Sequence, residues 1–257
     1  MGYAVANLRN VSEIRSAVAK AAEWFGDRID VLVNNAGIAR AYFTAGDGTM
    51  EDPATAEQWS EYLDTNLSAA FLVSQAVIPF MKSQNPAVEG RSEEHLHGDK
   101  RLDEGGCILH ISSFRAHQSD PDCEGYAAAK AGLVGLTQAM AVSGQRWGIR
   151  VNVISPGWVS VRHECREGDE EAAKKAQGDL EGVAPHEEAA SEARMEVWSA
   201  RQEEETYKEP HKQHPAGRLG RGEDVAEAVE YLMGAGFMNG QEMIIDGGAS
   251  KRKNPKV

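Results

Sequence analysis

The feature that most constrains the fold of this chain is a regular alternation of short apolar runs with longer segments of helical period. The apolar runs are rich in β-branched residues and too short for helices, which indicates buried strands. They occupy residues 29–33, 107–111, 149–154 and 242–245. Apolar residues recur at helical spacing in the segments around them, at 11–25, 59–81, 124–144 and 225–233.

Strands separated by helices of this length pair in parallel, because each helix returns the chain to the starting edge of the sheet. The pattern therefore predicts an α/β fold with an open, doubly wound, mostly parallel sheet. The chain has 257 residues, 41% of them hydrophobic, and we expect one domain over residues 1–257. Ligands of such sheets bind beyond the carboxyl ends of the strands. Three predicted strands end in turn-forming or polar sequences, namely Asn34-Asn35-Ala36-Gly37, Ser112-Ser113 and Pro156-Gly157.

Two polar segments interrupt the alternation and are predicted to be exposed insertions. Residues 84–104 have no apolar period, and residues 163–213 contain stretches rich in Ala, Glu, Lys and Arg. The second insertion is strongly acidic, with 15 acidic and 6 basic residues between His163 and Glu209. It therefore carries most of the formal net charge of −13. We expect one or two short solvated helices there.

Composition and charge argue against several classes of protein. A net charge of −13 disfavours binding to nucleic acids and to anionic membranes. No apolar run approaches the roughly 20 residues of a membrane span, and the first residues lack the basic and apolar regions of a signal peptide. Three cysteines are too few for a disulfide framework, and the absence of Cys-x-x-Cys and His-Glu-x-x-His spacings predicts no metal site. We expect a cytoplasmic protein without nucleic-acid or membrane partners.

Tyr126 and Lys130 are the first candidates for chemistry, because they stand four residues apart on a predicted helix and share one face. An ammonium one turn from a phenol favours the phenolate and lowers the phenol pKa from its usual value near ~10. Such a phenol can take a proton from a hydroxyl or give one to a carbonyl oxygen. The alternative is a pair that merely touches on the helix surface.

Two further polar residues can complete such a site. Ser113 lies thirteen residues before Tyr126, at the end of the preceding predicted strand, where its hydroxyl can hold the same substrate oxygen or simply shape a turn. Asn66 lies on the apolar stripe of the predicted helix 59–81, where a buried amide needs partners. It is either a satisfied core asparagine or a polar bridge toward Lys130.

Taken together, these motifs resemble the short-chain dehydrogenase/reductase family in order and approximate spacing. The motifs are Asn34-Asn35-Ala36-Gly37, Asn66, Ser113, Tyr126-Ala127-Ala128-Ala129-Lys130, Asn152-Val153-Ile154-Ser155-Pro156-Gly157 and the closing Asp246-Gly247-Gly248. The resemblance implies a Rossmann-like fold, NAD or NADP as cofactor, and interconversion of a secondary alcohol and a ketone by hydride transfer. It also implies a homo-oligomer, because the helices that carry Asn66 and Tyr126 commonly pack across a subunit interface in this family.

The resemblance assigns roles to individual residues. Tyr126 would be the proton donor or acceptor, Lys130 would lower its pKa and bind the nicotinamide ribose, Ser113 would orient the substrate oxygen, and Asn66 would hold a proton-relay water. The cofactor would be contacted by Asn7, where an adenine-binding Asp is usual, by Asn34, Ala36 and Gly37, and by the backbone near Pro156, Gly157 and Val159.

One departure from the family limits these expectations. No Gly-x-x-x-Gly-x-Gly occurs before Asn34, and Tyr3 to Leu8 resembles the end of the family's third strand. We therefore expect an N-terminally truncated fold that lacks the Gly-rich pyrophosphate loop within roughly 50 absent residues. The alternatives to an active oxidoreductase are a cofactor-free pseudoenzyme and a scaffold repurposed for isomerisation or cyclisation. The acidic insertion 163–213 begins where the family's substrate lid lies, and it is either an enlarged lid that favours a cationic substrate or a solvated excursion.

Overall fold

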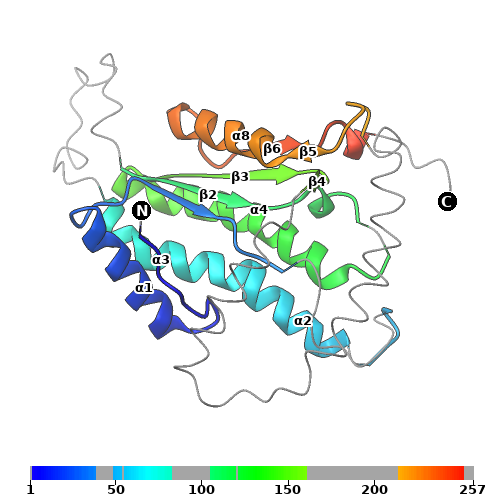
Figure 1. Cartoon of the computed structure of the whole chain (residues 1–257), viewed down its shortest axis with the longest axis horizontal. Coiled ribbons are helices and arrows are strands. Elements are labelled where there is room, and N and C mark those ends of the chain that lie inside the picture. Colours follow the sequence, from blue (N-terminus) through cyan, green and yellow to red (C-terminus); the bar gives the residue numbers. More distant parts are fainter. Residues whose placement is uncertain are drawn as a thin grey trace.

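The computed structural model describes residues 2–38, 49–53, 55–82, 105–119, 121–160 and 214–251 (Figure 1). Its centre is a four-stranded parallel sheet with the strand order β1-β2-β3-β6. The strands span Val31–Asn34, Cys107–Ile111, Arg150–Pro156 and Glu242–Ile245. The expected α/β fold with a parallel sheet is therefore confirmed. Both predicted insertions, 84–104 and 163–213, lie outside the described residues.

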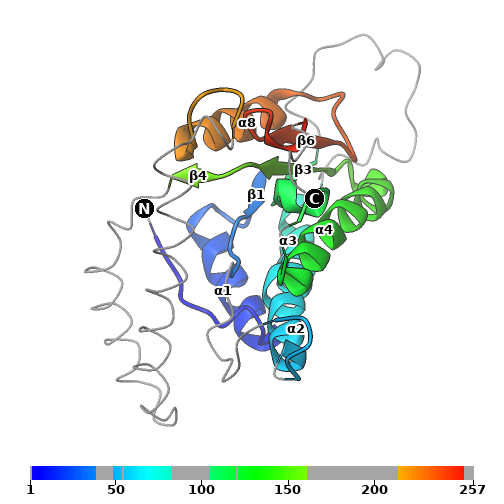
Figure 2. The same ribbon diagram turned by 90° about the vertical axis from the view of Figure 1, so that its right-hand side faces the viewer.

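Helices cover both faces of the sheet (Figures 1 and 2). On one face, α1 (Val11–Trp24), α3 (Ala69–Met81) and α4 (Glu124–Gly144) pack on side chains of β2 and β3. On the other face lies α8 (Gly222–Gly234), whose Ala228 and Leu232 contact Leu109 and Ile154. The two central strands, β2 and β3, are buried on both faces, which explains why they appear in the sequence as continuous apolar runs.

The helix expected over 59–81 consists of three sections. α2 (Thr55–Leu63) is followed by a π-helical turn, Asp64–Ser68, and then by α3. A π-helical turn inserts an extra residue into the helix and is common at functional sites. Here it contains the buried Asn66.

The start of the chain is described by one helix cap and one irregular segment. The N-cap of α1 is Asn10, whose side chain accepts hydrogen bonds from the backbone N–H groups of Ser12 and Glu13. The segment from Tyr3 to Leu8 is not a strand, and Tyr3 and Val5 are exposed. A strand needs a neighbour, and β1, at the edge of the sheet, pairs only with β2 among the described residues.

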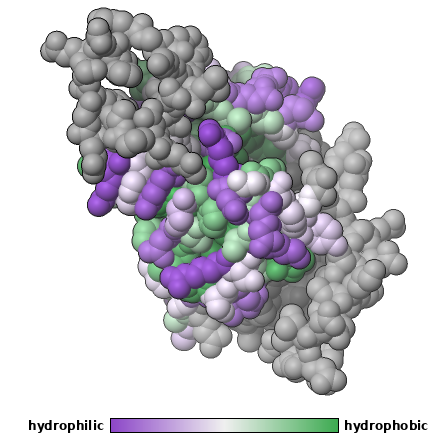
Figure 3. Space-filling model, turned by 90° about the vertical axis from the view of Figure 1, so that its left-hand side faces the viewer, coloured by the Kyte–Doolittle hydropathy of each residue, from purple (hydrophilic) through white to green (hydrophobic). Residues whose placement is uncertain are grey.

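Other apolar side chains near α1 and β1 are also exposed. Figure 3 views the side on which α1 lies and shows apolar patches between hydrophilic side chains. Trp24 and Phe25 at the end of α1 and Val33 of β1 are among the exposed large apolar residues. No helix in the described part of the chain is long and apolar enough to cross a membrane.

A short parallel ladder between β4 (Val159–Ser160) and β5 (Gly220–Arg221) was not expected from the sequence. Two-residue strands leave no periodic signal. The ladder fixes the chain just beyond the end of β3, where Gly157 and Trp158 follow the buried Pro156.

Candidate active site

The candidate site is built at the carboxyl ends of the parallel strands. β2 ends at Ile111 and continues into Ser112, Ser113 and a 3-10 turn over Phe114–Ala116. Ser113 is the N-cap of that turn, and its Oγ accepts a hydrogen bond of 3.2 Å from the backbone N–H of Arg115. The same hydroxyl is hydrogen-bonded to the phenol of Tyr126. The structure thus brings Ser113 and Tyr126 together, although they come from different elements.

Tyr126 lies in the first turn of α4 and is held in place by a neighbouring ring. The Tyr62 and Tyr126 rings meet edge to face, with 6.1 Å between their centroids. This contact depends on Gly125, where an added Cβ would lie only 2.7 Å from Cδ2 of Tyr62. The glycine therefore lets α2 approach the start of α4 closely enough to support the phenol.

The pKa of Tyr126 is shifted in the direction opposite to the one that its spacing from Lys130 predicts. Burial raises the pKa of the phenol, and this effect outweighs the lowering by the Ser113 hydrogen bond and by the charge of Arg115. The expectation of a lowered pKa is therefore wrong, because the loss of solvent around the phenolate outweighs these two lowering effects.

Lys130 is only 5% exposed and lies against the same tyrosine, with its Nζ 5.6 Å from the centroid of the Tyr126 ring. Nζ donates a 2.9 Å hydrogen bond to the carbonyl of Ile111, at the end of β2. The carbonyl of Lys130 in turn accepts a 2.7 Å hydrogen bond from Ser112 Oγ. Burial lowers the pKa of Lys130 to about 8, which still leaves the amine mostly protonated at neutral pH.

Asn66 links the π-helical turn to the loop after β1. Its Oδ1 accepts a 2.7 Å hydrogen bond from the N–H of Ile38, and its Nδ2 donates one of 2.9 Å to the carbonyl of the same residue. An added Cβ at Gly37 would lie 2.7 Å from Asn66 Oδ1 and 3.5 Å from Lys130 Nζ. Asn66 is thus a buried amide whose hydrogen bonds are satisfied. Its side chain and that of Lys130 both lie next to Gly37.

The residues expected to contact a cofactor differ in burial and orientation. The Asn34 amide donates to Ser74 Oγ at 3.0 Å and approaches His110 Nδ1 at 3.1 Å, so it faces the interior between β1 and α3. Ala36 and Gly37 are exposed in the loop that follows. Asn7 is exposed before α1, where its Oδ1 accepts a hydrogen bond of 3.0 Å from the N–H of Arg9.

At the end of β3, Pro156 is buried and Gly157 is closely packed. A Cβ at Gly157 would lie 2.8 Å from Cα of Asp246 and 2.9 Å from Nε2 of His214. His214 also accepts a hydrogen bond of 3.1 Å from the N–H of Trp158. Val159 then enters β4. This packing fixes the backbone from Pro156 to Val159, which is expected to contact the nicotinamide.

Arg115 is a site residue that the sequence argument missed. It is 7% exposed, its Nη1 lies 3.3 Å from Cys123 Sγ, and its Cζ lies 4.9 Å from the centroid of a Trp158 ring. The only available signal was an arginine two residues after Ser113, in a region without periodicity. Among the described residues, no group of three His, Cys, Asp or Glu side chains is arranged to hold a metal ion.

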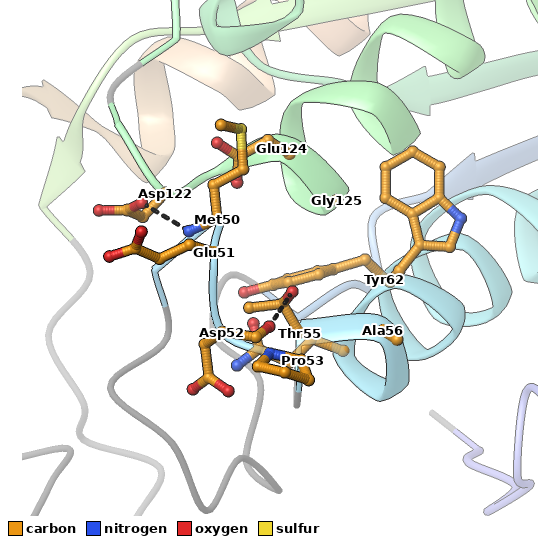
Figure 4. Close-up of a pocket in the computed structure, with 12 residues that line it drawn as sticks. Met50, Glu51, Asp52, Pro53, Thr55, Ala56, Tyr62, Asp122, Glu124 and Gly125 are labelled. Atoms are coloured by element: carbon orange, nitrogen blue, oxygen red, sulfur yellow. Dashed lines mark hydrogen bonds between the residues drawn. The ribbon is translucent and has the colours of Figure 1, made fainter.

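A cavity of about 410 Å³ lies beside Tyr62 (Figure 4). It is bounded by the segment before α2, by α2 itself and by the start of α4, and the Tyr62 ring that lines it also contacts Tyr126. Its wall carries four carboxylates, those of Glu51, Asp52, Asp122 and Glu124. Asp122 accepts a hydrogen bond of 3.1 Å from the N–H of Met50.

Sequence comparisons agree with the geometry. Residues 2–90 match the family model described as short chain dehydrogenase, and residues 95–197 match the one described as Enoyl-(Acyl carrier protein) reductase. An uncharacterized oxidoreductase of Thermotoga maritima is 31% identical over 240 residues, which cover 92% of this chain and 71% of the relative. The chain belongs to the short-chain dehydrogenase/reductase family. The 3-oxoacyl-[acyl-carrier-protein] reductase FabG of Escherichia coli is 28% identical over 244 residues, covering 94% of this chain and 75% of the relative.

Solved structures of short-chain dehydrogenases share the same fold. A short chain dehydrogenase from Burkholderia cenocepacia J2315, solved in complex with NADP, superposes with a TM-score of 0.62 at 26% identity. The superposition covers 95% of this chain and 74% of that one. The family and the Rossmann-like fold expected from the sequence are therefore confirmed.

Proposed function

We propose that this short-chain dehydrogenase/reductase is an NAD(P)-dependent oxidoreductase that interconverts a secondary alcohol and a ketone, with Tyr126 as the acid/base. The observation that carries the proposal is the convergence of Ser113, Tyr126 and Lys130 at the end of β2. The Tyr126 phenol is hydrogen-bonded to Ser113, and the Lys130 ammonium lies near its ring. The NADP complex of a structural neighbour supports the choice of cofactor.

The residues around Lys130 fit the nicotinamide ribose of a dinucleotide. Its Nζ has three protons, and Ile111 O is its one hydrogen-bond acceptor among the described residues, so two protons can serve ribose hydroxyls. Gly37 leaves the space between Asn66 and Lys130 free of a side chain. When bound, the nicotinamide supplies or accepts the hydride. Asn34, with its amide turned inward, would support the loop after β1 rather than touch the cofactor.

Within this site the side chains of the protein supply the proton for reduction of the ketone. Because burial raises its pKa, Tyr126 is neutral at pH 7 and can donate a proton to a carbonyl oxygen as the ketone is reduced. Ser113 Oγ lies beside the phenol and would orient that oxygen. The Lys130 charge stabilises the phenolate that remains, and Asn66 holds the neighbouring loop in place.

Calorimetric titration with NADH and NADPH tests the proposal first. Saturable binding supports the oxidoreductase, whereas no binding up to millimolar concentrations favours a cofactor-free pseudoenzyme. Binding without ketone reduction, together with conversion of a substrate at constant oxidation state, would favour the isomerase or cyclase alternative.

Tyr126→Phe then tests the proposed acid/base. We expect the variant to lose at least 10²-fold in kcat while its cofactor affinity stays within about twofold, because the ring remains and only the hydroxyl is lost. Tyr231→Phe on α8 is the matched control, since that tyrosine is exposed on the other side of the sheet. Full activity of Tyr126→Phe would contradict the mechanism.

We also propose a homo-oligomer. The helices α2, α3 and α4 leave Trp59, Phe71 and Val142 exposed, and a second copy of the chain can cover such side chains.

A further inference from the structure

Glu242, the first residue of β6, is a carboxylate at the start of an otherwise apolar strand. The strand continues with Met243, Ile244 and Ile245, and two of these, Met243 and Ile245, pack against the apolar cluster that contains α8 residues. The side chain of Glu242 is only 16% exposed. A carboxylate in such surroundings is costly unless its oxygens accept hydrogen bonds, so its partners explain why the strand tolerates it.

The Glu242 carboxylate accepts hydrogen bonds from two different parts of the chain. Ser155, on the neighbouring strand β3, is fully buried, and its Oγ donates to Oε1 at 2.5 Å. His117 Nε2 lies 2.8 Å from both Oε1 and Oε2. Because a carboxylate only accepts, Nε2 carries the hydrogen and is the donor. Hydrogen bonds to a charged group are stronger than those between neutral groups, so both contacts restrain the residues that make them.

The two donors lead to two different halves of the candidate site. His117 directly follows the 3-10 turn Phe114–Ala116, whose N-cap is Ser113. Ser155 directly precedes Pro156 and Gly157, the backbone that is expected to contact the nicotinamide. The carboxylate of Glu242 therefore connects the turn that begins at Ser113 to the end of β3. We call the three side chains of His117, Glu242 and Ser155 the Glu242 bridge.

The 3-10 turn that begins at Ser113 is only three residues long. The N–H of Ala116 donates to the carbonyl of Ser113 at 3.0 Å, and the N–H of Arg115 donates to Ser113 Oγ at 3.2 Å. Hydrogen bonds in 3-10 turns have poorer geometry than those in α-helices, so a short turn gains from an anchor at its end. Since the Ser113 hydroxyl is also hydrogen-bonded to the phenol of Tyr126, a shift of the turn would change this contact as well.

We propose that Glu242 is a positioning residue, which through His117 and Ser155 holds the Ser113 hydroxyl at a fixed distance from the backbone that contacts the nicotinamide. The inference rests on the proposed function, because it gives the Glu242 bridge a role in placing the substrate oxygen beside the cofactor. Glu242 acts only through its two neighbours. A displacement of about 1 Å among reacting groups can lower the rate by about 10²-fold, so a restraint of this kind affects turnover.

Hydrogen exchange tests the Glu242 bridge without any substrate or cofactor. The rate for the Arg115 amide is measured by NMR at pH 7 relative to that for the Leu109 amide in β2, which reports opening of the whole sheet. His117→Ala and Glu242→Leu are each expected to raise this ratio by about tenfold or more, because the turn loses its anchor. Glu242→Gln keeps an acceptor for both donors and is expected to leave the ratio within about threefold of the wild type.

Reduction of ethyl acetoacetate by NADPH and by NADH then measures the effect on the reaction. His117→Ala is expected to lower kcat by about tenfold or more, while the KM for the cofactor stays within about threefold because the bond from Ser155 remains. Glu242→Gln is expected to retain at least about a third of wild-type kcat. In the Glu242→Leu background, His117→Ala is expected to cause no further loss, because the two residues act through the same hydrogen bond.

Asp30→Ala is the matched control. It also removes a carboxylate with a side-chain partner, Arg28, but Asp30 lies just before β1, at the amino ends of the strands, whereas the site lies at their carboxyl ends. This variant is expected to change neither kcat nor the exchange of the Arg115 amide.

The two measurements separate this inference from the proposed function. Faster exchange of the Arg115 amide in His117→Ala, combined with a wild type that reduces no ketone, supports the Glu242 bridge and removes only the proposed function. Unchanged exchange in both His117→Ala and Glu242→Leu overturns the positioning role. So does an active enzyme whose kcat is unchanged by His117→Ala, or a double variant in which the two losses add.

Discussion

At the scale of single residues, burial rather than pairing sets the titration behaviour of the site. Tyr126, Lys130 and His110 all have pKa values shifted toward the neutral form by burial. His110, on β2, shows the effect most clearly, because burial and the Lys130 charge lower its pKa to about 4. Its Nδ1 lies 3.1 Å from the Asn34 amide, and its Nε2 has no hydrogen-bond partner among the described residues.

His110 therefore makes the fold sensitive to acid. An unfolded histidine has a pKa near ~6.5, so between pH 6.5 and 4 the unfolded chain binds more protons than the folded one, and stability falls as pH falls. From pH 6.5 to 5 we expect a loss of about 2 kcal/mol in the free energy of unfolding from this residue alone. His110→Asn keeps an acceptor for Asn34 and removes the titration. Urea unfolding at both pH values should show a shallower pH dependence in the variant, and parallel curves would contradict the assignment.

The sequence could bring together the candidate residues Ser113, Tyr126 and Lys130 because their signal is spacing and order along the chain. It could not predict the sign of the Tyr126 pKa shift, because burial depends on what packs around the phenol in three dimensions. The sequence did not predict Arg115 as a site residue for a related reason. Its partners, Cys123 and Trp158, lie on two other elements, and only the closed sheet brings them together.

At the scale of elements, the sequence predicts where the elements lie but not how closely α2 approaches the start of α4. The bounds of α4, β2 and β6 agree with the sequence-based prediction, because these segments have strong apolar patterns and clear ends. The π-helical turn at Asn66 left no such signal, since one extra residue in a turn does not disturb an apolar stripe visibly. The same holds for the contact of Gly125 with Tyr62, which is a matter of packing distance.

Gly125→Ala tests this close approach. Its new methyl group would lie 2.7 Å from Tyr62 Cδ2, so Tyr62 must move and its contact with Tyr126 is disturbed. We expect a loss of about 1–3 kcal/mol in the free energy of unfolding and at least a tenfold loss in kcat. Gly135→Ala is the control in the same helix, because a Cβ there meets nothing within 4 Å. It should stabilise the protein by about 0.5–1 kcal/mol with unchanged activity. Equal behaviour of the two variants in thermal unfolding would rule out the packing argument.

At the scale of the whole molecule, polar and apolar surfaces are unevenly distributed. The chain carries a net charge of −13, yet α2, α3 and α4 present Trp59, Phe71 and Val142 to solvent. Like charge on two copies opposes association in general, so a specific apolar contact is needed to hold them together. The sequence indicated these apolar residues but not which of them remain exposed after folding.

Phe71→Asp is expected to break the proposed homo-oligomer, because it places a carboxylate in the apolar contact between two copies that already repel each other. Sedimentation velocity at micromolar concentration should show the wild type at a multiple of the 27.9 kDa chain mass and the variant at the monomer mass. Raising the salt concentration should strengthen wild-type association, since it screens the net negative charge. Phe237→Asp is the control, because Phe237 is fully exposed beyond α8, on the other face of the sheet. If Phe71→Asp sediments like the wild type, or if Phe237→Asp also dissociates, the helical face formed by α2, α3 and α4 is not the interface.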